Sequence, residues 1–129
     1  MRWITMKRDM DLIRLILLEL EKVANGLGST KIKLDGFSAE EIGYHSQLLV
    51  EAGFVIGINL THNRSEHPEY MLNKLTWEGH DFLDACRDNT RWGKAKEIAS
   101  KAGGVTLNMM KDILVQLTTA TISEIIKHA

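Results

Sequence analysis

The sequence has few of the features that mark secreted, membrane-spanning or disulfide-stabilised proteins. Its 129 residues include one cysteine, Cys86, so no disulfide can form within the chain, and we expect a reducing compartment such as the cytoplasm. No apolar run approaches the roughly 20 residues of a membrane-spanning helix, so we expect no membrane partner. The apolar residues 15–18 are also too short a run for the core of a signal peptide.

Neither sign of charge dominates the chain. The 16 basic and 17 acidic side chains give a net charge of -1, which excludes a global attraction to nucleic acid or to an anionic membrane. Residues 36–92 contain four basic and nine acidic side chains, a local charge of -5, whereas each flank carries +2. Any basic surface must therefore be local. The candidate cations are Lys7, Arg8, Arg14, Lys31, Lys33, Arg64, Lys94, Lys96 and Lys101.

Motifs for catalysis and metal binding are missing as well. The sequence contains no nucleophile elbow, no phosphate-binding glycine loop and no identifiable pair of catalytic carboxylates. Cys86 has no histidine near it in the sequence to activate it, and His62 and His67 lack a companion ligand at metal-binding spacing. We therefore expect no enzymatic activity, no cofactor and no metal site.

Hydrophobic spacing predicts a first helix over residues 9–24, with Asp9 as its cap and Gly26 as its stop. The alternation of charged and apolar residues in 31–34 predicts a short strand after it. Residues 1–5 precede a second methionine, Met6. We interpret them as an extension from an upstream start and expect them to be loosely ordered.

The start of the second helix is the best marked position in the chain. Ser38 and Glu41 have the spacing of a capping box, and Gly53 supplies a C-terminal stop. His45 falls on the apolar face of this helix. We expect it to be buried and hydrogen-bonded to backbone rather than to bind a ligand.

A β-hairpin is predicted next. Apolar residues at 54, 56, 58 and 60 alternate with others, as in a half-buried strand. Residues 63–69, with the only proline, Pro68, have the composition of a hairpin loop, and residues 70–75 can return antiparallel.

Three helices are expected after the hairpin: one capped by Thr76 and ending near Arg87, one over residues 92–102, and one over residues 107–127. We predict a single domain, 1–129, with a core of residues 6–89 and a helical extension of residues 90–129. Trp77, Phe82 and Trp92 are predicted to form a satellite core. The alternative is that they are base-stacking or partner-binding aromatics.

Three segments of the chain carry a family resemblance. YHSQLLVEAGFV, residues 44–55, resembles the end of the recognition helix and the first wing strand of winged-helix regulators. Together with residues 6–21 and 75–96, it resembles a family of short bacterial and phage-associated proteins catalogued as a domain of unknown function. The resemblance implies an α+β fold, namely a winged helix with a two- or three-stranded antiparallel wing sheet and additional C-terminal helices. No activity comes with it.

Two functions remain open at this point. By fold analogy the chain is a DNA-binding transcriptional regulator or a phage-associated accessory protein, with Tyr44, Gln47 and Arg64 as contacts. Residues 25–37, however, predict that the supporting helix of a helix-turn-helix is missing or very short, and glutamates on the second helix would repel the DNA backbone. The alternative is a protein-interaction module that binds its partner without DNA, through Glu40, Glu41 and Glu51.

The last helix has an apolar face that we expect to be buried against another surface. Leu107, Met110, Leu114 and Leu117 follow helical spacing along it. These side chains either pack within their own domain, against the first helix, or pair with a second copy in a homodimer.

Overall fold

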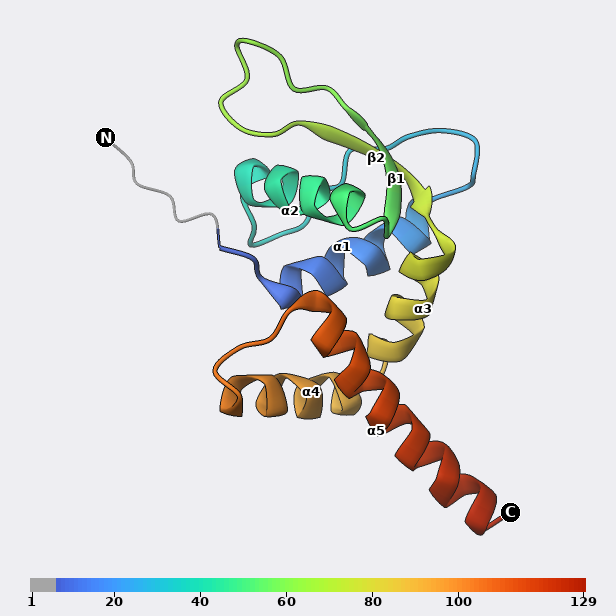
Figure 1. Cartoon of the computed structure of the whole chain (residues 1–129). Coiled ribbons are helices and arrows are strands. Elements are labelled where there is room, and N and C mark those ends of the chain that lie inside the picture. The colour runs from blue at the N-terminus through green and yellow to red at the C-terminus, as the bar shows by residue number, and fades with distance from the viewer. Residues whose placement is uncertain (1–6) are drawn as a thin grey trace. The chain divides into compact units, whose positions relative to one another are not determined.

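The computed structural model describes residues 7–129, which form five helices and one two-stranded antiparallel sheet (Figure 1). The expectation of loose order at residues 1–5 lies outside the described residues. In chain order the elements are α1 (Met10–Val23), α2 (Ala39–Glu51), β1 (Val55–Asn59), β2 (Tyr70–Leu75), α3 (Trp77–Cys86), α4 (Asn89–Lys101) and α5 (Leu107–Lys127). The chain divides after His80 into two compact units. The predicted single domain, with its boundary near residue 89, stays a prediction.

Helix α1 forms as predicted. The Asp9 carboxylate accepts hydrogen bonds from the amides of Asp11, at 2.9 Å, and Leu12, at 3.3 Å, which satisfies two amides of the first turn. One face of α1 is fully buried and contacts α2 and β2. Its residues are Leu12, Ile13, Ile16, Leu17 and Leu20. This face is the centre of the core of the first unit.

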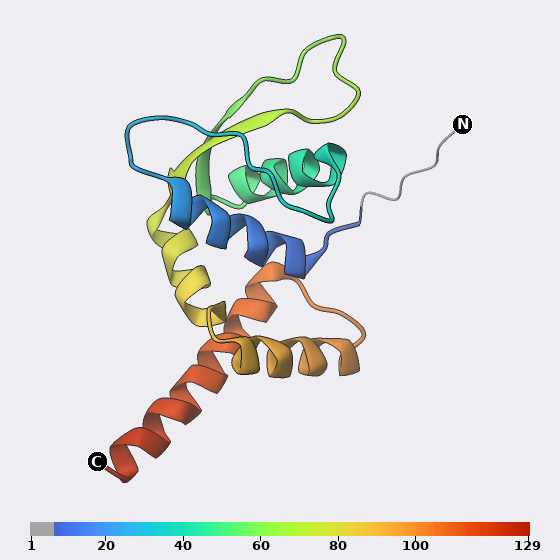
Figure 2. The same ribbon diagram turned by 180° about the vertical axis from the view of Figure 1, so that it is seen from behind.

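The connection between α1 and α2 contains no helix, as expected, and runs as an extended segment (Figure 2). The predicted strand at residues 31–34 is wrong. The segment pairs with the sheet at one point, where Thr30 and Leu72 exchange two backbone hydrogen bonds of 2.8 Å. Ile32 is buried and its lysine neighbours are exposed, so the alternation reflects one anchoring side chain rather than a ladder.

Helix α2 has the predicted limits. The Ser38 hydroxyl accepts from the Glu41 amide at 3.1 Å, and the Glu41 carboxylate accepts from the Ser38 amide at 3.0 Å, which completes the capping box. At the other end Gly53 adopts a φ of +77°, and the Phe54 amide bonds back to the Leu49 carbonyl at 3.0 Å. This Schellman ending turns the chain into β1.

The hairpin has the predicted strands, but the exposed face of β1 was not foreseen. Ile56, Ile58 and Leu60 are 48, 51 and 46% exposed, while Val55 is buried. Gly57 lies on the inner face, opposite the side of its two isoleucine neighbours. A Cβ there would lie 2.9 Å from the Leu72 side chain and 3.2 Å from that of Val50, so the glycine lets β1 approach α2.

Helix α3 begins after its cap, Thr76, whose hydroxyl oxygen accepts a hydrogen bond from the Gly79 amide at 3.1 Å. The helix contains the boundary between the two units, which falls after His80. Phe82 and Trp92 are buried, as a core role predicts, with exposed fractions of 0 and 3%. That they form one satellite core stays a prediction. The core role is wrong for Trp77, which is 79% exposed at the first position of α3.

In the second unit α4 packs against α5. Helix α4 begins at Asn89 rather than at residue 92, because the Asp88 carboxylate accepts from the Arg91 amide at 2.7 Å and caps the earlier turn. Gly103 and Gly104, with φ of +82° and +107°, separate the two helices. Helix α5 has the predicted limits and is capped by Thr106.

Candidate partner-binding surface

Four residues at helical spacing form the outward polar face of α2. Glu40, Tyr44, Gln47 and Glu51 follow one another at intervals of four, three and four residues, which places them along one side of the helix. Glu51 is exposed and the other three are half-buried. This α2 stripe carries two carboxylates, a phenol and an amide, and it contains no cation.

The two uncharged members of the α2 stripe have unused hydrogen-bonding groups. Within residues 7–129 neither the Tyr44 hydroxyl nor the Gln47 amide forms a hydrogen bond. The Tyr44 ring lies edge-on to the His45 ring, with centroids 5.6 Å apart and planes at 87°. The ring is therefore supported on one side while its polar end remains available.

His45 is buried and bonded to backbone at both ring nitrogens, as predicted. Its Nδ1 lies 2.8 Å from the Glu41 carbonyl oxygen, and its Nε2 lies 2.8 Å from the Asp9 amide nitrogen. Because the Asp9 amide can only donate, Nε2 is the acceptor and Nδ1 carries the proton. His45 thus joins the start of α1 to the second turn of α2 and is occupied structurally.

Glu41 differs in role from Glu40 and Glu51, although the sequence grouped the three as partner contacts. Its carboxylate is committed to the Ser38 amide in the capping box. Glu40 forms no hydrogen bond or ion pair among the described residues, and the same holds for Glu51. Only these two carboxylates of α2 are available without cost to the helix start.

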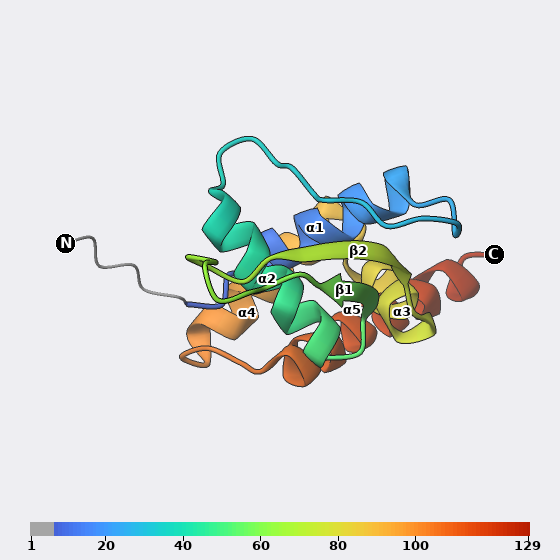
Figure 3. The same cartoon turned by 90° about the horizontal axis from the view of Figure 1, so that it is seen from above.

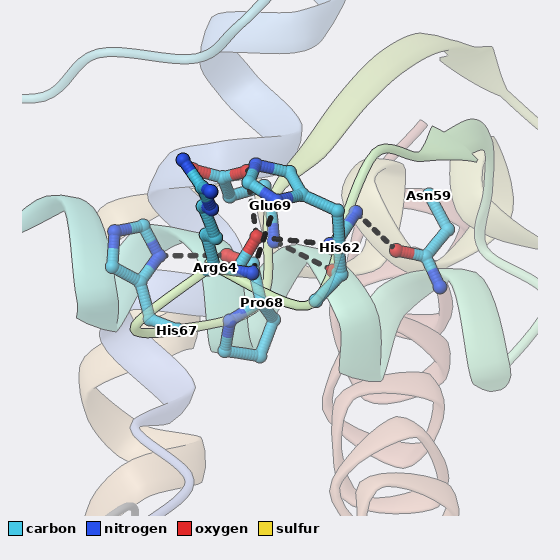
Figure 4. Close-up of polar contacts among 8 residues, drawn as sticks. Asn59, His62, Arg64, His67, Pro68 and Glu69 are labelled. Atoms are coloured by element: carbon cyan, nitrogen blue, oxygen red, sulfur yellow. Dashed lines mark hydrogen bonds and ion pairs between the residues drawn. The ribbon is translucent and has the colours of Figure 1, made fainter.

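The hairpin loop, residues 60–69, is held by its own polar groups (Figure 4). The Ser65 hydroxyl accepts from the His62 amide at 2.9 Å and donates to the Glu69 carboxylate at 3.0 Å. His62 Nε2 lies 3.6 Å from the same Glu69 carboxylate, and His62 Nδ1 accepts from the Arg64 amide at 3.2 Å. These bonds give the loop a defined shape.

The loop crosses over the N-terminal half of α2 (Figure 3). A Cβ at Gly43 would lie 2.0 Å from the Pro68 carbonyl oxygen, so the loop backbone rests directly on the helix. Arg64 is exposed, and among the described residues its side chain forms no hydrogen bond or ion pair. The three DNA contacts predicted from the sequence come from two elements, Tyr44 and Gln47 from α2 and Arg64 from the hairpin loop, and their role as DNA contacts stays a prediction.

The two loop histidines do not meet. His67 Nδ1 lies 2.9 Å from the Pro68 carbonyl oxygen, whereas His62 bonds to Arg64 and Glu69. Across the part of the chain that the structure describes, no three His, Cys, Asp or Glu side chains gather in a way that could hold a metal ion.

The residues predicted for a dimer helix are largely covered within the chain. Met110 and Leu114 are 2 and 0% exposed, and Leu107 and Leu117 are half-buried. The outward apolar face of α5 instead carries Val115, Ile122 and Ile126, which are 46, 49 and 68% exposed. The apolar residues of α5 were therefore predicted from helical spacing, but the division between its two faces was not.

These observations define an α+β protein whose second helix and hairpin carry its candidate contact residues. The chain belongs to the family described as "Hypothetical protein (DUF2513)", whose model matches residues 7–106. It is 36% identical over 110 residues to an "Uncharacterized protein" of Haemophilus influenzae, a match that covers 84% of this chain and 92% of that protein. No solved structure matches the chain. None of the helices within residues 7–129 has the length and apolarity required to span a bilayer.

Proposed function

We propose that this chain is a winged-helix-like module that binds a protein partner through the α2 stripe. The order of α1, the Thr30 bridge, α2 and a β-hairpin supports the winged-helix assignment, with the supporting helix replaced by the extended connection. The observation that carries the functional proposal is the chemistry of the stripe, which offers Tyr44 between two unpaired carboxylates.

This chemistry favours a protein over DNA as the partner. A tyrosine supported by a neighbouring ring is a frequent anchor of protein interfaces, because it buries a large apolar area and keeps a hydrogen-bonding end. Glu40 and Glu51 would face phosphates if α2 entered a DNA groove, and no lysine or arginine of α2 offsets them. The complementary partner carries basic side chains around an apolar recess.

The test is capture of a bacterial partner by the intact protein and by two charge-matched variants. Glu40→Lys with Glu51→Lys reverses the α2 stripe and spares Glu41, so the capping box survives. Glu78→Lys with Asp81→Lys makes the same change in charge at exposed positions of α3. We expect the first variant to lose the partner while remaining folded, and the second to retain it. Equal capture by all three proteins would contradict the proposal.

DNA binding is the second candidate, supported by the position of three cations. Lys31 and Lys33 lie beside the return of the hairpin loop, Arg64 is exposed within it, and none of them is paired among the described residues. Regulation of transcription would follow from such a site. If a random duplex pool is bound in a salt-dependent way, Arg64→Ala should reduce the magnitude of the salt slope by about 0.9. Absence of binding at low salt would contradict it.

Homodimerisation is proposed through the outward face of α5. Val115, Ile122 and Ile126 lie at helical spacing, and the surrounding threonines and isoleucines form helix poorly without packing. Light scattering should show a dimer that Ile122→Lys converts to a monomer. Two further variants, Thr119→Lys near the same face and Gln116→Lys beside it, show how far the dimer contact extends. Light scattering should find a monomer for each substitution that falls within the contact.

A further inference from the structure

A cleft of about 350 Å³ lies beside the N-terminal half of α2, on a different side of the helix from the α2 stripe. Three segments of the first unit line it: residues 31–37 of the connection, the first two turns of α2 and residues 67–70 of the hairpin. The volume falls in the range of small-ligand sites, which begins at about 300 Å³.

The floor of the cleft is apolar. Ile32 and Ile42 line the cleft and are only 5 and 8% exposed. Phe37 and Tyr70 are half-buried and add aromatic surface. Such a floor binds an apolar body rather than a hydrated ion, because burying the body removes apolar surface from water.

The rim of the cleft is cationic. Lys31 and Lys33 are exposed, and neither forms an ion pair among the described residues. The one carboxylate of the lining, that of Glu69, is already engaged by the Ser65 hydroxyl and lies 3.6 Å from His62. This rim is positive, although residues 36–92 as a whole carry a charge of -5. Two unpaired lysines above an apolar floor match a ligand with an anionic head.

The cleft is also held open by a fixed contact. The Pro68 carbonyl rests on Gly43, and the hydrogen bonds within the hairpin loop hold residues 67–70 in place. The wall formed by residues 67–70 is therefore preformed, which lowers the entropic cost of binding.

We propose that this cleft binds a small anion with an apolar body, with the body on Ile32, Ile42 and Phe37 and the carboxylate or phosphate head between Lys31 and Lys33. The site is independent of the protein-partner function of the α2 stripe, whose residues Glu40, Tyr44, Gln47 and Glu51 do not line it.

The probe is 8-anilino-1-naphthalenesulfonate, which joins an aromatic body to one anionic group, and the comparison compound is N-phenyl-1-naphthylamine, which lacks the sulfonate. Titration of the intact protein, followed by amide NMR, should shift resonances in residues 31–34, 37–43 and 67–70. We expect the anionic probe to bind more tightly than the neutral one. Shifts confined to other residues would overturn the proposal.

Two variants test separately the lysines that bind the anionic head and the apolar floor that binds the body of the ligand. Lys31→Gln with Lys33→Gln should weaken the anionic probe about 3- to 10-fold and leave the neutral one unchanged. Its control, Lys22→Gln with Lys74→Gln, removes two exposed lysines of the same unit that do not line the cleft. Ala39→Phe fills the cleft from the exposed first position of α2 and should weaken both probes. Equal effects of the two lysine pairs would contradict the assignment.

Competition then identifies the natural head group. Displacement of the anionic probe by 3-phenylpropionate indicates a carboxylate ligand, and displacement by phenyl phosphate indicates a phosphate ester. Failure of both compounds to displace it would contradict a site for apolar anions.

Discussion

The backbone carbonyl oxygen of Pro68 occupies the space that a side chain at Gly43 would need. A Cβ at residue 43 would lie 2.0 Å from that oxygen and 3.1 Å from the carbonyl carbon, distances that only a shift of backbone could relieve. The close approach of the hairpin loop to α2 therefore depends on glycine at this position, and both the loop position and the cleft beside it follow from that contact.

We predict that Gly43→Ala lowers the free energy of unfolding by about 1–3 kcal/mol, the usual cost of overpacking a buried contact. The matched control is Gly93→Ala in α4, where a Cβ meets nothing within 4 Å. Alanine there should stabilise by about 0.5–1 kcal/mol, because it favours helix more than glycine does. Denaturant unfolding measures both. A Gly43→Ala protein as stable as the intact chain would show that the loop does not rest on α2.

His45 gives a second prediction, on the junction of α1 and α2. His45→Leu removes the acceptor of the Asp9 amide and should cost about 1–3 kcal/mol, because a partly buried donor is left unpaired. His45→Gln retains an oxygen able to accept that bond and should cost less. Unfolding free energies, together with hydrogen exchange at the Asp9 amide, report the difference. Equal losses for leucine and glutamine would mean that ring packing, not the hydrogen bond, matters at this site.

Local signals in the sequence predicted several of the helix ends. Ser38 with Glu41, Gly53 and Thr76 each bond to the nearby amides or carbonyls that their residue types suggest. These interactions span only a few residues, so a single sequence specifies them.

Long-range contacts were not predictable in the same way. The strand predicted at residues 31–34 does not form. The connection pairs with the sheet only at Thr30, whose partner Leu72 lies far along the chain. The capping box of Ser38 and Glu41 was predicted, yet Glu41 was also grouped with Glu40 and Glu51 as a partner contact. The hydrogen bond from the Ser38 amide shows that the Glu41 carboxylate is engaged at the helix start. The cleft brings together three segments that no sequence pattern connects.

The hairpin shows that the alternation of side chains along a strand does not determine which face of the strand is buried. The alternation in residues 54–60 predicted β1 correctly as a strand, yet Ile56 and Ile58 face outward, whereas Phe54 and Val55 are buried. Alternation alone does not say which face meets the core, and a glycine on the inner face provides little apolar signal.

This assignment of faces gives a third prediction. Ile58→Thr changes a side chain that is 51% exposed and should alter the free energy of unfolding by less than about 0.5 kcal/mol. Leu72→Ala, on the inner face of the neighbouring strand and fully buried, should cost about 2–5 kcal/mol. Unfolding of the two variants in parallel tests the assignment. A larger loss for Ile58→Thr than for Leu72→Ala would reverse the two faces of the sheet.

Trp77 and Trp92 should differ in access to solvent, since their exposed fractions are 79 and 3%. In a Trp3→Phe background, removal of either one leaves a single fluorophore. We expect acrylamide to quench Trp77 strongly and Trp92 weakly, and Trp77 to emit at longer wavelength. Trp77→Phe should change the free energy of unfolding by less than about 0.5 kcal/mol, whereas Trp92→Ala should cost about 3–5 kcal/mol. Strong shielding of Trp77 in the intact protein would instead mean that a second copy covers the start of α3, and dilution would then restore quenching.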